Sequence, residues 1–122
     1  MALGTSKKQT SLRMTTNWKT LVAIATYNER ENIPRLVQWI RQVTPTTDIL
    51  VIDDGSPDGT GSWCEQMAGE NSWFHFIQRG VKQGLGTATV CGMQFAIEGH
   101  YELWIGMDAD LSHPPERLPA MI

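Results

Sequence analysis

Asp108 and Asp110 are the residues whose spacing points most directly to chemistry. They follow an apolar run, so both carboxylates leave the end of a predicted buried strand and can project into one cleft. Two like charges so close repel each other unless a cation lies between them, and Mg²⁺ or Mn²⁺ prefers such oxygen ligands. The pattern predicts a divalent metal site that substrate phosphates complete. The alternative is a helix start capped by Asp110 or Ser112, with Pro114 and Pro115 in its first turn.

A second pair of carboxylates, Asp53 and Asp54, follows a β-branched run and precedes Gly55. Asp54 can accept a hydrogen bond from a base N–H or a ribose hydroxyl, which would select a nucleotide. On this hypothesis, Asp54→Asn should lose nucleotide affinity while its melting temperature stays almost unchanged. The alternative is an Asx turn that only shapes the loop. Residues 54–65 also come close to an EF-hand calcium loop, but that motif needs a preceding helix, and residues 49–52 predict a strand.

A third polar loop contains Arg79 and Lys82 beside Gly84 and Gly86. We expect this basic, flexible segment to meet a diphosphate. The alternatives are solvated charges and a helix-start glycine. The glycine spacing is a poor dinucleotide fingerprint, because the third glycine is absent.

The elements that must position these loops alternate along the chain from residue 20 onward. The predicted strands cover 21–25, 49–52, 73–77 and 101–107, and the predicted helices cover 33–43, 60–67 and 87–98. This order predicts an α/β fold, a Rossmann-like three-layer α/β/α sandwich with a mostly parallel sheet. Asn28 or Asn32 is expected to cap the first helix, and Gly99 to end the third. Ligands of such sheets bind beyond the carboxyl ends of the strands, where the polar loops lie.

Composition and charge narrow the class of protein. The chain has 122 residues, 41% of them hydrophobic, which fits one soluble globular unit, and no apolar run approaches a membrane span. Residues 1–19 carry basic side chains and no acid, so we expect a disordered basic leader that could touch anionic lipid. The rest is acidic, which argues against nucleic acid as a partner. Cys64 and Cys91 have no metal-site spacing and predict reduced thiols in a cytoplasmic protein.

Taken together, the loops resemble the successive motifs of family 2 glycosyltransferases with the GT-A fold. The strings that carry the resemblance are IATYNE at 24–29, VIDDGSPDGT at 51–60, RGVKQGLGTA at 79–88 and MDADLSHP at 107–114. The DDGSPDGT and DADLSHP strings are most similar to polyprenol (dolichol) phosphate mannosyltransferases. The resemblance covers the chain from about residue 20 to its end.

The resemblance implies a role for each candidate residue. The implied ligands of a divalent metal are Asp108, Asp110 and Ser112, of which the two aspartates would be catalytic. The residues that would bind the nucleotide-sugar are Ala25, Tyr27, Glu29, Ile52, Asp54, Arg79, Lys82, Asp108 and Ala109. Ala25 stands where the family usually has a proline.

The implied reaction is transfer of a hexose to polyprenyl (dolichyl) phosphate with inversion at the sugar carbon, and the expected hexose is mannose from GDP-mannose. A phosphate acceptor is already an anion, so no strong general base is needed, and the Mg²⁺ or Mn²⁺ ion and the basic loop would stabilise the departing diphosphate. The alternatives are a family 2 transferase that uses a UDP-sugar, a haloacid-dehalogenase-type phosphatase, and an inactive nucleotide-binding fragment.

Such catalytic domains are much longer than this chain. Residues 20–122 are therefore expected to form the N-terminal, nucleotide-sugar-binding part of a GT-A domain. Alone, this part should leave apolar surface uncovered and form dimers or aggregates. A lipid acceptor implies peripheral contact with the cytoplasmic face of a membrane.

Overall fold

Strands and helices alternate along the part of the chain that the structure, a computed structural model, describes, residues 18–79 and 85–109. The strands are β2 (Thr20–Thr26), β3 (Asp48–Asp53), β4 (Phe74–Gln78) and β5 (Leu103–Asp108). The helices are α1 (Ile33–Val43), α2 (Thr60–Glu70) and α3 (Leu85–Glu98). Each predicted element is present, with ends that differ from the prediction by at most a few residues.

The four strands form one parallel sheet in the order β4-β3-β2-β5. The chain steps from β2 to β3 and β4 on one side and then returns to place β5 on the other side of β2. The strand order therefore reverses at β2, and the carboxyl ends of β2 and β5 form a topological switch point, where open α/β sheets bind ligands.

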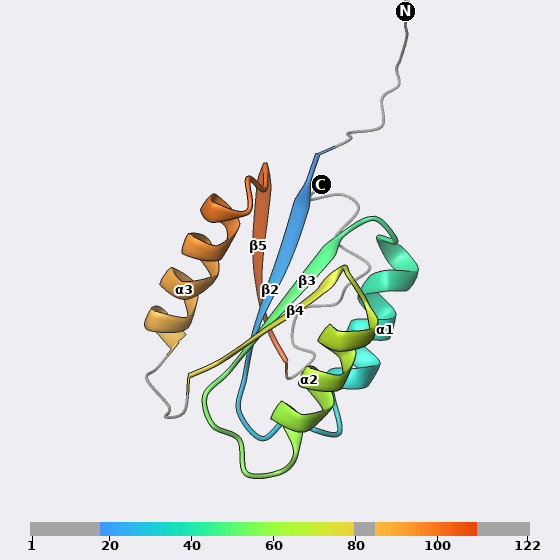
Figure 1. Cartoon of the computed structure of the whole chain (residues 1–122), viewed down its shortest axis with the longest axis vertical. Coiled ribbons are helices and arrows are strands. Elements are labelled where there is room, and N and C mark those ends of the chain that lie inside the picture. Colours follow the sequence, from blue (N-terminus) through green and yellow to red (C-terminus); the bar gives the residue numbers. More distant parts are fainter. Residues whose placement is uncertain (1–17, 80–84, 110–122) are drawn as a thin grey trace, which may run out of the picture.

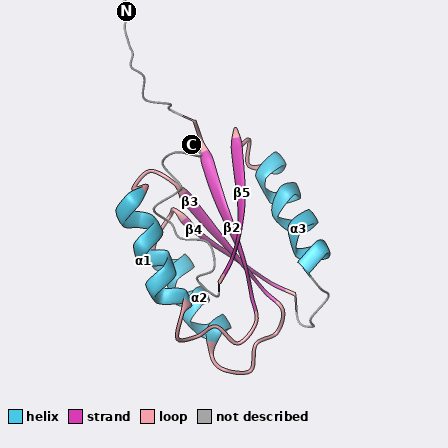
Figure 2. Ribbon diagram, turned by 180° about the vertical axis from the view of Figure 1, so that it is seen from behind, coloured by secondary structure: helices cyan, strands magenta, loops and turns pink. Residues whose placement is uncertain are grey.

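Helices cover both faces of the sheet. Helices α1 and α2 lie on one face and α3 on the other, as Figures 1 and 2 show from opposite sides. The core below α1 and α2 includes Val22, Ile24, Ile49 and Val51, and the core below α3 includes Leu21, Ala23, Leu50 and Ile52. Consecutive strand residues thus point to opposite faces, and both faces are apolar because both are covered. The predicted three-layer α/β/α sandwich is confirmed.

Helix α1 follows its apolar repeat, because Ile33, Leu36, Val37 and Ile40 are all buried against the sheet. Each such side chain contributes roughly 1.5–3 kcal/mol of burial energy. Pro34 lies in the first turn, where its missing N–H costs no helical hydrogen bond.

The predicted side-chain cap of α1 is wrong. Asn32 occupies the N-cap position, but its side chain makes no capping bond and instead donates to Glu29 Oε2 over 2.8 Å. The backbone carbonyl of Glu29 accepts from the N–H groups of Asn32 and Ile33 and takes the place of the side-chain cap. Asn28 adopts a left-handed conformation in the preceding turn (φ 57°).

Helix α3 ends at Glu98, as predicted, but the residue that turns the chain is His100 rather than Gly99. His100 has a left-handed backbone (φ 59°). Its N–H donates to the carbonyl of Ile97, and the N–H of Tyr101 donates to the carbonyl of Ala96. This is the Schellman pattern, which satisfies carbonyls at the end of a helix.

The amino edge of the sheet is closed by a small polar cluster. The Tyr101 hydroxyl donates to Asp48 Oδ2 over 2.6 Å, and His75 Nε2 lies 3.5 Å from the same carboxylate. Burial, together with the Asp48 carboxylate, raises the pKa of Tyr101 well above its ordinary value. Lys19 donates through Nζ to the carbonyl of Gly99, so it is part of this edge, although it belongs to the predicted leader. His75 Nε2 also lies 3.3 Å from the Tyr101 hydroxyl, so His75 belongs to the same cluster.

The two cysteines differ in their surroundings, and both are free thiols. Cys64 on α2 is fully buried in the core, and burial raises the pKa of its thiol to about 12, whereas Cys91 on α3 is half-buried. Because the thiolate is the reactive form, we expect Ellman's reagent to modify Cys91 in the native chain and Cys64 only on unfolding. Equal rates for the native Cys64→Ser and Cys91→Ser variants would contradict this placement.

The EF-hand alternative is wrong, because residues 48–53 form a strand and the loop that follows joins this strand to α2. Gly59 adopts a left-handed conformation (φ 91°) immediately before α2, which favours glycine there. Among the described helices, none is both long enough and apolar enough to span a bilayer.

Candidate functional site

The switch point brings three candidate residues around one cavity. Ala25 at the end of β2 pairs with Ile52 of β3 on one side and with Asp108 of β5 on the other. The cavity has a volume of about 280 Å³, and its lining is Ala23, Ala25, Ile52, Ala88, Thr89, Trp104, Gly106, Met107 and Asp108. Small side chains line much of it, which leaves space between the sheet and the first turns of α3.

Asp108 is the last residue of β5, and its half-buried side chain lines this cavity. Its carboxylate is the oxygen ligand that a hard divalent cation prefers. Ala109 is buried and packs in the core on the α1 and α2 face. The other predicted metal ligands, Asp110 and Ser112, lie outside the described residues, as does Lys82.

A metal site of described residues alone is not present. Within residues 18–79 and 85–109, no group of three or more His, Cys, Asp and Glu side chains could hold a metal ion. Asp108 fits a metal by its donor type and its place beside the cavity, and the predicted site needs Asp110 in addition.

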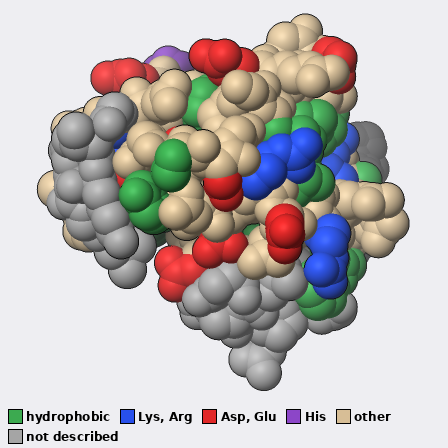
Figure 3. All heavy atoms as spheres, turned by 90° about the horizontal axis from the view of Figure 1, so that it is seen from below, with side chains coloured by type: hydrophobic (Ala, Val, Ile, Leu, Met, Phe, Trp, Pro, Cys, Tyr) green, Lys and Arg blue, Asp and Glu red, His purple; other side chains and the backbone are tan. Residues whose placement is uncertain are grey.

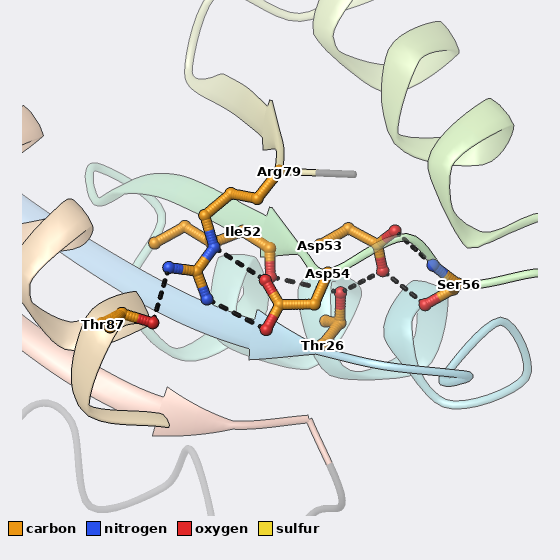
Figure 4. Close-up of polar contacts among 7 residues, drawn as sticks. All are labelled: Thr26, Ile52, Asp53, Asp54, Ser56, Arg79 and Thr87. Atoms are coloured by element: carbon orange, nitrogen blue, oxygen red, sulfur yellow. Dashed lines mark hydrogen bonds and ion pairs between the residues drawn. The ribbon is translucent and has the colours of Figure 1, made fainter. Parts of the chain in front are cut away.

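The adjacent carboxylates Asp53 and Asp54 point to opposite faces and have different partners (Figure 4). Asp53 has an exposed fraction of 0%; it accepts from the Thr26 hydroxyl and the Ser56 N–H, each over 2.9 Å. The Ser56 hydroxyl also donates to this carboxylate. Asp53 therefore shapes the loop, as the turn alternative predicts.

Asp54 forms a two-pronged ion pair with Arg79 on the α3 side of the sheet (Figure 4). Arg79 donates through Nε to Oδ1 over 2.7 Å and through Nη2 to Oδ2 over 2.9 Å, and each side chain is only 10% exposed. The bond to Asp54 raises the pKa of the Arg79 guanidinium. The third nitrogen, Nη1, donates to the Thr87 hydroxyl over 2.9 Å. The guanidinium predicted to meet a diphosphate is thus directed at Asp54.

The remaining candidates, Tyr27 and Glu29, lie in the loop between β2 and α1. Tyr27 is 40% exposed, and Glu29 helps to line a separate surface hollow of about 350 Å³. The neighbouring N–H groups of Asn28 and Arg30 donate to side chains of the 53–59 loop, Ser56 Oγ over 2.7 Å and Asp58 Oδ2 over 3.0 Å.

The Asp58 carboxylate ties these loops together. Burial raises its pKa, but bonds from the Thr60 hydroxyl and from the N–H groups of Arg30 and Thr60 outweigh burial, and the pKa lies below its ordinary value. Asp58 is therefore ionised at neutral pH and holds the 27–32 loop beside the start of α2. Acidic and basic side chains lie intermixed over this end of the molecule, seen from below in Figure 3.

The structure thus brings together some of the residues that the sequence predicted for the site. Ala25, Ile52 and Asp108 share one cavity, Asp54 and Arg79 lie paired on the same side of the sheet, and Tyr27 and Glu29 lie in the adjoining loop. Sequence reasoning gave no role to Thr87, although this residue lies within the RGVKQGLGTA string, and it missed the loop-shaping partners of Asp53.

Residues 21–122 match the family described as "Glycosyl transferase family 2". The chain belongs to this family. Membership leaves the phosphatase alternative without support. The residues that carried the resemblance in sequence all lie within the matched range.

Several curated relatives of the chain have names that refer to mannose and a polyprenyl carrier. The chain is 42% identical over 104 residues to the "Undecaprenyl-phosphate mannosyltransferase" of Micrococcus luteus and 43% identical over 105 residues to the "Polyprenol monophosphomannose synthase" of Mycolicibacterium smegmatis. It is 36% identical over 106 residues to the "Dolichol-phosphate mannosyltransferase" of Pyrococcus furiosus. Each match covers 85% of this chain, but only 43%, 40% and 29% of the relatives, respectively.

A solved structure supports the fold assignment. The mannosyltransferase of Pyrobaculum calidifontis "in complex with GDP-Man and Mn2+" superposes with a TM-score of 0.67 over 86% of this chain and 31% of that one. The sequence identity is 22%, so the likeness concerns the fold. The described part of this chain has the fold of the matching part of a GT-A mannosyltransferase.

Proposed function

We propose that the chain supplies the donor-binding part of a metal-dependent, inverting glycosyltransferase that moves mannose from GDP-mannose to polyprenyl phosphate. The observation that carries the proposal is the identity of 42% and 43% to two relatives whose names specify mannose and a polyprenyl carrier. The placement of Asp54 and Asp108 on the α3 side of the same sheet edge supports a donor site there.

The nucleotide would lie across the carboxyl ends of β2 and β3. Ala25 and Ile52 supply an apolar wall, and Asp54 offers a carboxylate to a base or ribose donor. Tyr27 and Glu29 would complete this pocket from the loop that Asp58 holds in place. Asp108 and the backbone of Ala109 would contact the sugar and diphosphate end.

A divalent cation would be held by Asp108 and Asp110, with Ser112 nearby. Mn²⁺ is favoured because the Pyrobaculum calidifontis mannosyltransferase binds this ion together with GDP-Man, and Mg²⁺ fits the same oxygen ligands. When bound, the ion supplies charge that stabilises the departing nucleoside diphosphate. The basic side chain of Lys82 would assist at the same diphosphate.

The acceptor would be an anionic lipid phosphate. Because such a phosphate is already a nucleophile near neutral pH, the chain needs to position it rather than deprotonate it. A lipid acceptor places the reaction at a membrane surface, and we propose peripheral contact with the cytoplasmic face. Association of two copies would cover apolar side chains that α3 leaves exposed, among them Val90, Met93 and Ile97.

A transfer assay tests the proposal. Residues 20–122 would replace the matching part of the Micrococcus luteus relative, and the chimera would be supplied with labelled GDP-mannose and undecaprenyl phosphate. We expect labelled lipid from the chimera and none from the 122-residue chain alone, because the chain spans 43% of that relative. A chimera that unfolds cooperatively but transfers only from a UDP-sugar, or transfers nothing, would contradict the proposal.

A further inference from the structure

Arg79 connects three parts of the candidate site through one guanidinium group. Its Nε and Nη2 bind the two carboxylate oxygens of Asp54, and its Nη1 binds the hydroxyl of Thr87 in the first turn of α3. Its backbone N–H donates to the carbonyl of Asp53 over 2.9 Å, which fixes the base of the side chain at the end of β4. Asp54, the first residue after β3, is thereby tied to helix α3.

The stability of the fold alone does not account for this arrangement. Both charged side chains are 10% exposed, and the desolvation cost of a buried ion pair offsets much of its attraction. Apolar residues of similar size would often serve the fold equally well. What the pair does provide is a carboxylate with a single orientation, because a guanidinium fork fixes both of its oxygens.

The orientation leaves Asp54 able to bind a ligand. An ionised carboxylate has about four acceptor positions, two on each oxygen. Arg79 occupies one position on each oxygen, so a base N–H or a ribose hydroxyl can still bond to the others. A carboxylate that is already oriented loses less conformational freedom when the nucleotide arrives, and this raises affinity.

We propose that Thr87 is a positioning residue for nucleotide binding, which acts on Asp54 through Arg79. The Thr87 hydroxyl fixes the position of Arg79 Nη1, and this bond sets the plane of the guanidinium. The plane of the guanidinium in turn sets the orientation of the Asp54 carboxylate. Thr87, on helix α3, thereby affects the affinity for the nucleotide without touching the nucleotide. The inference rests on the proposed function, because it assumes that Asp54 receives a nucleotide.

The test measures GDP binding by calorimetry with Mn²⁺ present, on the 122-residue chain. Thr87→Val removes the hydroxyl at constant shape and should weaken binding about fivefold, the effect of losing roughly one hydrogen bond. Thr87→Ser retains the hydroxyl and should restore affinity to within about twofold. Thr46→Val, at an exposed threonine between α1 and β3, is the matched control and should have no effect.

A double-mutant cycle separates positioning from a direct contact. In an Asp54→Asn background, Thr87→Val should cause no further loss, because the residue through which it acts is already altered. An equal loss in both backgrounds would overturn the inference, and so would a Thr87→Val variant with wild-type affinity. Binding of neither GDP nor UDP by the wild-type chain would overturn the proposed function, and this inference with it.

A second measurement needs no nucleotide. The side-chain Nε–H signal of Arg79 in a ¹⁵N NMR spectrum should be protected from exchange, and Thr87→Val should shift it whereas Thr87→Ser should not. Exchange of this proton at the solvent rate in the wild-type chain would mean that the ion pair is not fixed, which overturns the inference.

Discussion

In an Asp108→Ala variant, Mn²⁺ should no longer strengthen the binding of GDP. Asp108 would supply a metal ligand at the end of β5, and loss of a ligand removes the ion that bridges the protein and the diphosphate. Even residues that only support metal ligands are worth 10-fold to 100-fold in metal affinity, so we expect the Kd of GDP with Mn²⁺ to rise roughly 100-fold. Calorimetry with and without Mn²⁺ measures the change.

Two comparisons make this result specific. Without metal, the difference in GDP affinity between the variant and the wild type should be much smaller than with Mn²⁺, because the base and ribose contacts remain and no ion bridges Asp108 to the diphosphate. Glu98→Ala removes an exposed carboxylate at the far end of α3 and serves as the control. If Asp108→Ala binds GDP and Mn²⁺ as tightly as the wild type does, the metal is not held at this strand end.

Asp54→Asn should lower the free energy of unfolding by about 3–5 kcal/mol, the usual cost of leaving one partner of a buried ion pair without its counter-charge. Arg79, at 10% exposure, would then be buried beside a neutral side chain. Sequence alone led to the opposite expectation, an almost unchanged melting temperature. Urea unfolding followed by tryptophan fluorescence measures the difference.

The matched test of this ion pair is the variant with both charges removed. Asp54→Asn with Arg79→Gln should lose clearly less stability than the sum of the two single variants, because it leaves no unpaired charge. Additive losses would contradict the pairing. Nucleotide affinity should fall in all three variants, so reduced affinity alone does not separate binding from folding here.

The fold could be predicted because its elements have clear periodicities. The repeat of Ile33, Leu36, Val37 and Ile40 identifies α1, and the apolar run at residues 21–25 identifies a strand covered on both faces. Helix α2 is less regular, and its last turn to Glu70 was missed because these residues carry no apolar repeat. The end of α3 was misattributed to Gly99 because glycine usually takes the left-handed position that His100 adopts.

The sequence named candidate residues for the site but did not predict the contacts that the described ones make. If the alternation of β3 continues by one residue, Asp53 and Asp54 point to opposite faces, and that signal was available in the sequence. The contact from Arg79 to Thr87 joins the end of β4 to the first turn of α3, and no local pattern encodes it. The roles of the site residues, Asp110, Ser112 and Lys82 among them, are predictions that the experiments described here test.

The measurement that tests the account most directly is a titration of the wild-type chain with GDP-mannose and with UDP-glucose, each with and without Mn²⁺. The account predicts that GDP-mannose binds more tightly than UDP-glucose and that Mn²⁺ strengthens this binding. Binding that is independent of metal, or that prefers UDP-glucose, would contradict a GDP-mannose site at the carboxyl ends of β2, β3 and β5.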